Sequence, residues 1–236
     1  MASNAPQVQV LLGIKTELLR DMFTPLLSNI KAQFTTIEVD YTKVKDLFKD
    51  GRPQVVLAVD GHLTRPKYEG LHAQLAEYTK DGGAVICCCN FSSFCRPPDL
   101  NQFLARFGFQ WKSGDYQRTD FALNEAFRHV FGATAFSQLE PLCSMKALHV
   151  ANVSYNDRIY GPISMSETQS MVFPAMSVDQ SQSPALLGRY SKGYLGYLGD
   201  VNNEECTQAV LMAMISMLCP PILISRDRLT IRQDLL

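Results

Sequence analysis

Short apolar runs alternate with stretches of helical periodicity through the first half of the chain. The apolar runs predict strands at Val8–Leu12, Thr35–Val39, Gln54–Asp60 and Ala84–Cys89. The last two are apolar almost throughout, which is typical of strands that are covered on both faces. Because strands and helices follow one another with short links, the pattern predicts a parallel sheet with helices on both of its faces.

Apolar residues at helical spacing fill the segments between these strands. The predicted helices run from Thr16 to Ile30 with a kink or a new start at Pro25, over Thr42–Lys49, onward from Pro66, and over Leu100–Phe107. Glycines that follow these segments act as stop signals, because glycine readily takes the backbone conformation that ends a helix.

The middle of the chain is less regular. We expect extended segments at Phe109–Lys112, Thr119–Leu123 and Lys146–Val153, and a short helix at Asn124–Phe131. Residues 154–183 are polar and rich in Ser and Gln, with scattered apolar positions. This composition predicts extended hairpins or an excursion over the surface.

The pattern becomes regular again in the last third. Pro184–Tyr190 and Gly193–Leu198 flank a short glycine-containing turn, which predicts a hairpin, and Asn202 is expected to cap a helix over Asn203–Leu218. We therefore expect one α/β domain over residues 1–218: a three-layer sandwich with a flavodoxin-like, mostly parallel sheet and a β-hairpin near the C-terminus. Residues 219–236 are expected to form a tail that packs on the domain or on a partner.

Composition narrows the class of protein but names no chemistry. The chain has 22 Lys and Arg against 23 Asp and Glu, a formal net charge of −1, which argues against nucleic acid as a main partner. No apolar run approaches the ~20 residues of a membrane span, and the N-terminal residues lack a signal-peptide pattern. The expectation is a cytoplasmic protein with no membrane partner.

The cysteines do not suggest a metal site or a disulfide framework. There are seven, an odd number, and Cys87, Cys88 and Cys89 are consecutive, so in a strand they alternate between faces and cannot converge on one ion. No C-x-x-C pair is present. Most are expected to be reduced and buried as small apolar side chains, and no metal or cofactor is predicted.

The segment Ser183–Glu205 (SPALLGRYSKGYLGYLGDVNNEE) carries the most informative pattern. Its strand, turn, second strand ending Leu-Gly-polar and following helix resemble the closing segment of class I glutamine amidotransferase-like proteins, with the trehalose-utilisation (ThuA-like) branch nearest. Ala84–Cys89, followed by Asn90-Phe91-Ser92-Ser93, resembles the strand that carries the nucleophile in that superfamily. The resemblance covers most of residues 7–218, and the alternative is a flavodoxin-like fold of other ancestry.

The resemblance implies a cysteine nucleophile in a Gly-x-Cys-x-Gly turn and a histidine base after the last strand. Cys89 lies nearest the nucleophile position, but no glycine flanks it, and Phe91 stands where glycine would let the chain turn closely. Asp200 occupies the position of the histidine, and a carboxylate there would raise the pKa of a neighbouring thiol. Glutaminase and thiol-protease activity are therefore not expected.

Ligands of open parallel sheets bind beyond the carboxyl ends of the strands. The residues expected there form a polar, mildly acidic mouth. Such a mouth could hold a sugar-like polyol or a divalent cation, or could be a solvated sheet end with helix caps. The expected ligand-binding residues are Asp60, Asn90, Ser92, Ser93, Asp115, Arg118, Asn202 and Glu204.

Two functions from different classes follow. The first is a non-catalytic, degenerate amidotransferase-like domain that binds a small polar ligand or a protein partner, as a monomer or a homodimer. The second is a hydrolase or isomerase of a small polyhydroxylated substrate, with Cys89, His62 and Asp200 as acid, base or nucleophile. For each residue a structural role is the alternative: His62 as a loop or capping residue, Asp200 in a hydrogen bond with Asn90, and Cys89 as a buried thiol.

Overall fold

The apolar runs of the first half build a parallel half-sheet. The computed structural model describes residues 7–13, 16–49 and 51–219, and places β1 (Gln7–Leu12) between β2 (Thr35–Asp40) and β3 (Val55–Asp60). β4 (Ala84–Asn90) pairs with the far side of β3, and β9 (Gly193–Leu198) pairs with β4, all in parallel. The strand order of this half, β2-β1-β3-β4-β9, is that of flavodoxin-like sheets.

The second half of the sheet is antiparallel and comes from the less regular part of the sequence. β8 (Ala185–Tyr190) forms the predicted hairpin with β9. β7 (Arg158–Pro162), β5 (Lys112–Leu123) and β6 (Leu142–Ala151) follow, which gives a nine-stranded sheet in the order β2-β1-β3-β4-β9-β8-β7-β5-β6. The predicted α/β fold class with its C-terminal hairpin is confirmed.

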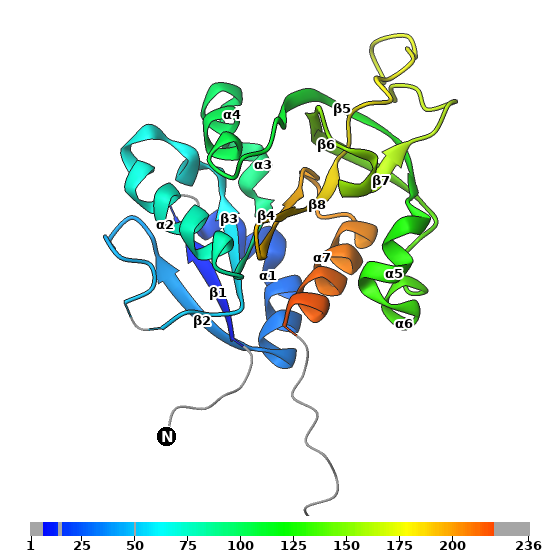
Figure 1. The fold of residues 1–236 in the computed structure, drawn as a ribbon. Coiled ribbons are helices and arrows are strands. Elements are labelled where there is room, and N and C mark those ends of the chain that lie inside the picture. Colours follow the sequence, from blue (N-terminus) through cyan, green and yellow to red (C-terminus); the bar gives the residue numbers. More distant parts are fainter. Residues whose placement is uncertain (1–6, 14–15, 50, 220–236) are drawn as a thin grey trace, which may run out of the picture.

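Helices cover both faces of the sheet and complete three layers (Figure 1). One face carries α1 (Thr16–Gln33), α5 (Arg128–Phe131), α6 (Ala133–Phe136) and α7 (Glu205–Leu218). The other carries α2 (Glu69–Lys80), α3 (Phe91–Phe94) and α4 (Pro97–Ala105). Short 3₁₀ turns lie at η1 (Gly61–Thr64), η2 (Pro66–Tyr68), η3 (Glu125–Phe127) and η4 (Tyr155–Asp157).

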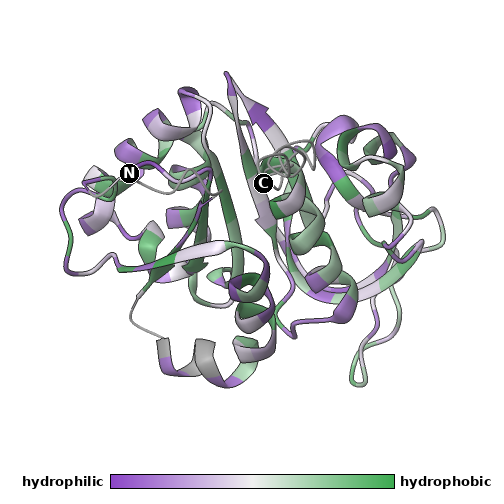
Figure 2. Ribbon diagram, turned by 90° about the horizontal axis from the view of Figure 1, so that it is seen from below, coloured by the Kyte–Doolittle hydropathy of each residue, from purple (hydrophilic) through white to green (hydrophobic). Residues whose placement is uncertain are grey.

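Two apolar clusters hold the layers together, one on each face of the sheet. In β4, Ile86 and Cys88 belong to the cluster under α1 and α7, whereas Val85 and Cys87 belong to the cluster under α2 and α4. Because side chains alternate along a strand, both faces of β4 are buried, as its continuous apolar run predicts. Figure 2 shows the hydrophobic strands between helices whose outer surfaces are hydrophilic.

Some predicted elements are wrong. Thr42–Lys49 forms turns rather than a helix, because the Asp40 carboxylate accepts the backbone N–H and hydroxyl of Thr42, and Asp46 accepts the N–H of Phe48. Such local bonds compete with helical ones. The two extended segments expected within 109–123 form one strand, β5, that starts only at Lys112.

The helix around Pro25 and the cysteines add two details. α1 runs through Pro25 to Gln33 without a new start. Cys143 of β6 and Cys206 of α7 form a disulfide, which the sequence did not predict, while Cys87, Cys88, Cys89, Cys95 and Cys219 are free. The expected tail lies outside the described residues except for Cys219. No helix within the described ranges is long and apolar enough to cross a membrane.

Candidate functional site

A carboxylate and an imidazole form a buried pair just beyond β3. Asp60 ends the strand, and its Oδ1 accepts the backbone N–H of His62 at 3.0 Å and lies 2.8 Å from the ring Nδ1 of His62. Its Oδ2 accepts the hydroxyl of Tyr41 at 3.0 Å. The first of these bonds caps η1, and the ring of His62 stacks on Phe94. The cluster therefore fixes the imidazole in one orientation.

The charge of Asp60 is stabilised in this position. Burial alone would raise the pKa of the carboxyl, but hydrogen bonds from His62 and Tyr41 more than offset it and lower the pKa below its usual value. A carboxylate bound to one ring nitrogen is the arrangement that orients a histidine as a base. Asp60 and His62 are only 3% and 7% exposed, so little of the pair reaches the surface.

Cys89 lies at the turn from β4 into α3. Its φ of +57° places it in the left-handed region, which side chains other than glycine rarely occupy. A strained residue between a strand and a helix is the backbone geometry of a nucleophile elbow. The sequence placed Cys89 at this position, and the backbone bends there even without flanking glycines.

The surroundings of this thiol are apolar. Cys89 is 6% exposed and belongs to the apolar cluster under α1 and α7. Its Sγ lies 3.8 Å from the Sγ of Cys88, whose pKa is raised by that contact and by burial. None of the hydrogen bonds described joins Cys89 to an imidazole or to a cationic side chain. The geometry retains the elbow without a partner that would form a thiolate.

Asp200 follows β9 at the position where the resemblance implies a histidine base. Its Oδ1 accepts the N–H of Asn202 at 2.9 Å and its Oδ2 accepts the N–H of Glu204 at 2.7 Å. Burial raises the pKa of this carboxyl, against the effect of the two N–H groups. Both N–H groups precede α7, whose N-cap residue is Glu204 without a side-chain cap, so the predicted capping role of Asn202 is wrong. The carboxylate of Asp200 instead fixes the loop that leads from β9 into the helix.

Asn90 and Ser92 bring the ends of β4 and β9 together. The Ser92 hydroxyl donates to the backbone oxygen of Asp200 at 3.4 Å. Asn90 is 2% exposed, and its side-chain Nδ2 has no hydrogen-bond partner, so the hydrogen bond expected between Asn90 and Asp200 is absent. Ser93 is exposed. Ends of three strands thus contribute polar groups, but most of these groups are buried.

The remaining predicted residues lie in two separate networks on the antiparallel side. Arg118 of β5 forms an ion pair with Glu204 at 2.5 Å and also donates to the backbone oxygen of Ser144. Asp115 is held by Gln182, which accepts its N–H at 2.7 Å and donates to its Oδ2 at 2.9 Å. Arg118 and Glu204 are therefore brought together, whereas Asp115 has its own partner.

Strand β6 covers the end of β9 and helps to bury the polar groups. The N–H of Leu148 donates to the backbone oxygen of Gly199, and the Tyr197 hydroxyl donates to that of Leu148. Among the described residues, no group of three His, Cys, Asp or Glu side chains is arranged to hold a metal ion.

Two residues of interest were not singled out from the sequence. Tyr41 directly follows β2, at the same edge of the sheet where Asp60 ends β3, so the strand pattern could have found it. His149 on β6 is 1% exposed, its Nε2 has no hydrogen-bond partner, and burial lowers its pKa to about 4. Only its tertiary position reveals this histidine, because its strand gives no hint of which face is covered.

Comparison with solved structures places this architecture among known ones. A protein described as ThuA-like from Bacteroides uniformis superposes with a TM-score of 0.55 at 10% identity, over 92% of this chain and 94% of that one. The chain has the ThuA-like fold. No protein-family model and no curated protein matches the sequence.

The same fold occurs inside larger proteins. A β-galactosidase from Bacillus circulans superposes with a TM-score of 0.50 at 9% identity over 92% of this chain, which corresponds to 31% of the β-galactosidase. A glutamine amidotransferase from Thermotoga maritima gives a TM-score of 0.40 at 9% identity, over 83% of this chain and 75% of that one. This TM-score is too low to support an argument about fold or function. At these identities the likeness to the ThuA-like protein and to the β-galactosidase concerns the fold alone, and function must be argued from the residues.

Proposed function

We propose that this chain is a non-catalytic, degenerate amidotransferase-like domain that acts as a ligand-binding or protein-interaction module. The proposal rests on the hydrogen bonds that Asp200 accepts. Both of its carboxylate oxygens accept backbone N–H groups just before α7, so the residue at the base position serves the fold. A carboxylate held in this way cannot lower the pKa of a thiol as a histidinium does.

The environment of Cys89 supports the same conclusion. Thiol nucleophiles act as thiolates, which need a cationic or hydrogen-bonding partner, and apolar burial opposes their formation. Cys89 is buried beside another thiol, and the neighbouring Phe91 is fully buried in the opposite cluster. A substrate carbonyl would have to displace this packing to reach the sulfur.

A specific observation favours the alternative, a hydrolase or isomerase of a small polyhydroxylated substrate. His62 is oriented by the charged Asp60 at 2.8 Å, as a general base would be. The hydroxyl of Ser92 and the unpartnered amide of Asn90 lie at the next strand end. For catalysis, a substrate would have to enter a cluster that is now largely buried.

Hydrolysis assays distinguish the two functions. Wild-type protein is incubated with a panel of amide, ester and glycoside substrates, beside His62→Ala, Asn90→Ser and Asp200→Asn variants whose folding is checked by circular dichroism. We expect no turnover above that of a buffer blank. Turnover by the wild type that is lost in folded His62→Ala or Asn90→Ser would overturn the non-catalytic proposal in favour of the enzyme.

The wider setting is part of the same proposal. We propose a cytoplasmic protein, on the five cysteines that are free beside the Cys143–Cys206 disulfide. We propose that it has no nucleic-acid or membrane partner, on the balanced charge of the chain. Residues 1–218 are proposed as the domain and 219–236 as a tail that packs on it or on a partner, with a homodimer as one arrangement. Light scattering on the full chain and on a chain ending at Cys219 measures whether the tail changes the oligomeric state.

A further inference from the structure

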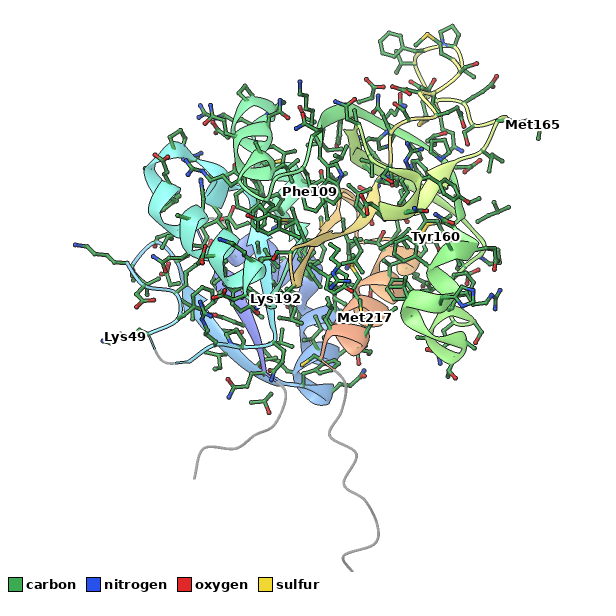
Figure 3. The ribbon with its side chains drawn as sticks, in the orientation of Figure 1. Lys49, Phe109, Tyr160, Met165, Lys192 and Met217 are labelled. Carbon is green, nitrogen blue, oxygen red and sulfur yellow. A yellow bond between two sulfur atoms is a disulfide. The ribbon has the colours of Figure 1, made fainter. Side chains whose placement is uncertain are left out.

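An apolar finger projects from the antiparallel side of the molecule. It comprises residues 165–177 between β7 and β8, and forms the yellow loop beyond β5 and β7 in Figure 1. The most exposed large apolar side chains among the described residues are all here: Met171 (104%), Val172 (81%), Met165 (80%) and Phe173 (70%). Figure 3 shows Met165 at the outer edge of the molecule. Soluble surfaces rarely gather such residues unless something binds them.

The base of the finger is fixed to the sheet. The N–H of Gln169 donates to the backbone oxygen of Arg118, and the Thr119 hydroxyl donates to that of Glu167 at 2.7 Å. Across the finger, Thr168 and Met176 exchange two hydrogen bonds. At its tip, the Ser170 hydroxyl accepts the N–H groups of Val172 and Phe173. The exposed apolar residues are therefore presented by an ordered turn.

A cavity lies between the finger and the sheet. Its volume is about 620 Å³, and its walls include Tyr116 and Arg118 of β5, Lys146 of β6, and Met171 and Phe173 of the finger. This volume is in the range of sites that bind ligands. Two aromatic rings and flexible methionine side chains form a surface that can adapt to large apolar groups.

The charge at this cavity is positive and only partly balanced. Lys146 lies opposite Arg118 in the strand register, and Arg118 is neutralised by Glu204. The Nζ of Lys146 lies 5.4 Å from the ring centre of Tyr116. Within the part of the chain that the structure describes, no carboxylate forms an ion pair with Lys146. One ammonium group is thus available beside the apolar walls.

We propose that this cavity and finger bind a peptide segment of a partner protein that carries an acidic side chain next to a large apolar one. The carboxylate pairs with Lys146, and the apolar side chain lies between Tyr116 and Phe173. Next to the cavity residues Met171 and Phe173, Val172 at the tip of the finger is exposed as well, so apolar surface is available outside the cavity for a longer ligand such as a peptide. This inference rests on the proposed binding function and specifies the partner's chemistry.

Selection from a random twelve-residue peptide library displayed on phage tests the proposal. We expect the wild-type protein to enrich peptides with Asp or Glu beside Phe, Trp or Leu. Synthetic copies of these peptides should bind Phe173→Ser about tenfold more weakly and Lys146→Glu about fivefold more weakly or worse. A peptide with Lys in place of its acidic residue should recover binding to Lys146→Glu, which a purely structural role would not produce.

Matched controls separate this site from general effects. Lys192→Glu makes the same charge change in the exposed turn between β8 and β9, and Val130→Ser removes an exposed apolar side chain of α5; both should bind like the wild type. The proposal is overturned if no peptide is enriched, if enriched peptides bind all variants equally, or if only the small probe 4-phenylbutyrate binds. Turnover in the hydrolysis panel would overturn the non-catalytic function. It would not change the interpretation of the binding results, because peptide affinity is measured separately from turnover.

Discussion

At Cys89 the backbone leaves the β-region, and a side chain in this left-handed conformation costs about 1 kcal/mol or more relative to glycine. The neighbouring Cys88 belongs to the same apolar cluster. Both thiols lie where the pairing of β4 with β3 shifts register, between Cys87 and Asn90, but only Cys89 has a positive φ. The two thiols therefore differ mainly in backbone conformation. The sequence alone does not show this difference, because three consecutive cysteines give no sign of which one has a positive φ. The pair allows the strain to be measured.

Replacing each cysteine with glycine should separate strain from burial. Both substitutions remove a buried side chain, but Cys89→Gly also relieves the left-handed strain, whereas Cys88 has no positive φ that glycine would relieve. We expect Cys89→Gly to retain about 1 kcal/mol more of the free energy of unfolding, measured by urea denaturation. Equal losses would show that the turn at Cys89 is unstrained.

The buried His149 makes stability depend on pH. Its pKa falls from 6.5 to about 4 on burial, so between these values the unfolded chain takes up a proton that the folded chain does not. The contribution of His149 to the free energy of unfolding is therefore fully present above about pH 6.5. It is lost as the pH falls toward 4, by on the order of 3 kcal/mol in total. The nearby Asp115 moderates this loss because its charge favours the protonated ring.

A variant isolates this contribution. His149→Phe removes the titrating ring from a position beside Phe121. The slope of the unfolding free energy against pH should therefore fall by about 1.4 kcal/mol per pH unit between about pH 6 and 4.5. His129→Asn, a change on the surface of α5, serves as the control and should leave the slope nearly unchanged. Parallel slopes for wild type and His149→Phe would mean that His149 titrates normally.

At the scale of the elements, the loop before α7 shows that a residue predicted to take part in catalysis can instead stabilise the fold. The sequence predicts Asn202 as the cap, but the N-cap residue of α7 is Glu204, which has no side-chain cap. Asp200 holds the preceding loop by accepting the N–H groups of Asn202 and Glu204. The choice depends on the path of the chain after β9, where the backbone of Val201 bonds to Lys146 of β6. Local sequence shows several residues able to cap, but on the path that the chain takes none of their side chains caps α7.

Removal of the Asp200 carboxylate should lower stability. Asp200→Ala deprives the N–H groups of Asn202 and Glu204 of their acceptors, so we expect a loss of about 1–2 kcal/mol in the free energy of unfolding by urea denaturation. Asn202→Ala should cost less than about 0.5 kcal/mol, because the side chain of Asn202 makes only a 3.4 Å bond to Glu204. The reverse order would show that Asn202 rather than Asp200 holds this loop.

At the scale of the whole molecule, the finger stands apart from the packed layers. Its apolar side chains are exposed, while hydrogen bonds at its base join it to β5. Residues 154–183 were expected to form hairpins or a surface excursion, and they supply both β7 and this finger. Their polar composition did not predict that the apolar residues would cluster at one exposed tip.

Shortening the finger should separate binding from folding. Replacing Ser170–Ala175 with Asn-Gly removes the exposed tip and keeps the pairing of Thr168 with Met176. We expect the melting temperature to change by less than about 2 °C, because the removed apolar side chains are largely exposed, while binding to selected peptides is lost. A fall of 10 °C or more in calorimetry would assign the tip a structural role.

The sequence by itself determined the parallel half of the sheet and its hairpin. These features follow from local patterns: continuous apolar runs mark strands covered on both faces, and alternation with helices fixes a parallel order. The tertiary structure alone decided how β5, β6 and β7 extend the sheet, which polar groups at the strand ends are buried, and where Lys146 meets the finger. Those outcomes depend on contacts between residues far apart in the chain, and antiparallel pairing at long range leaves no periodic signal that identifies the partner strand.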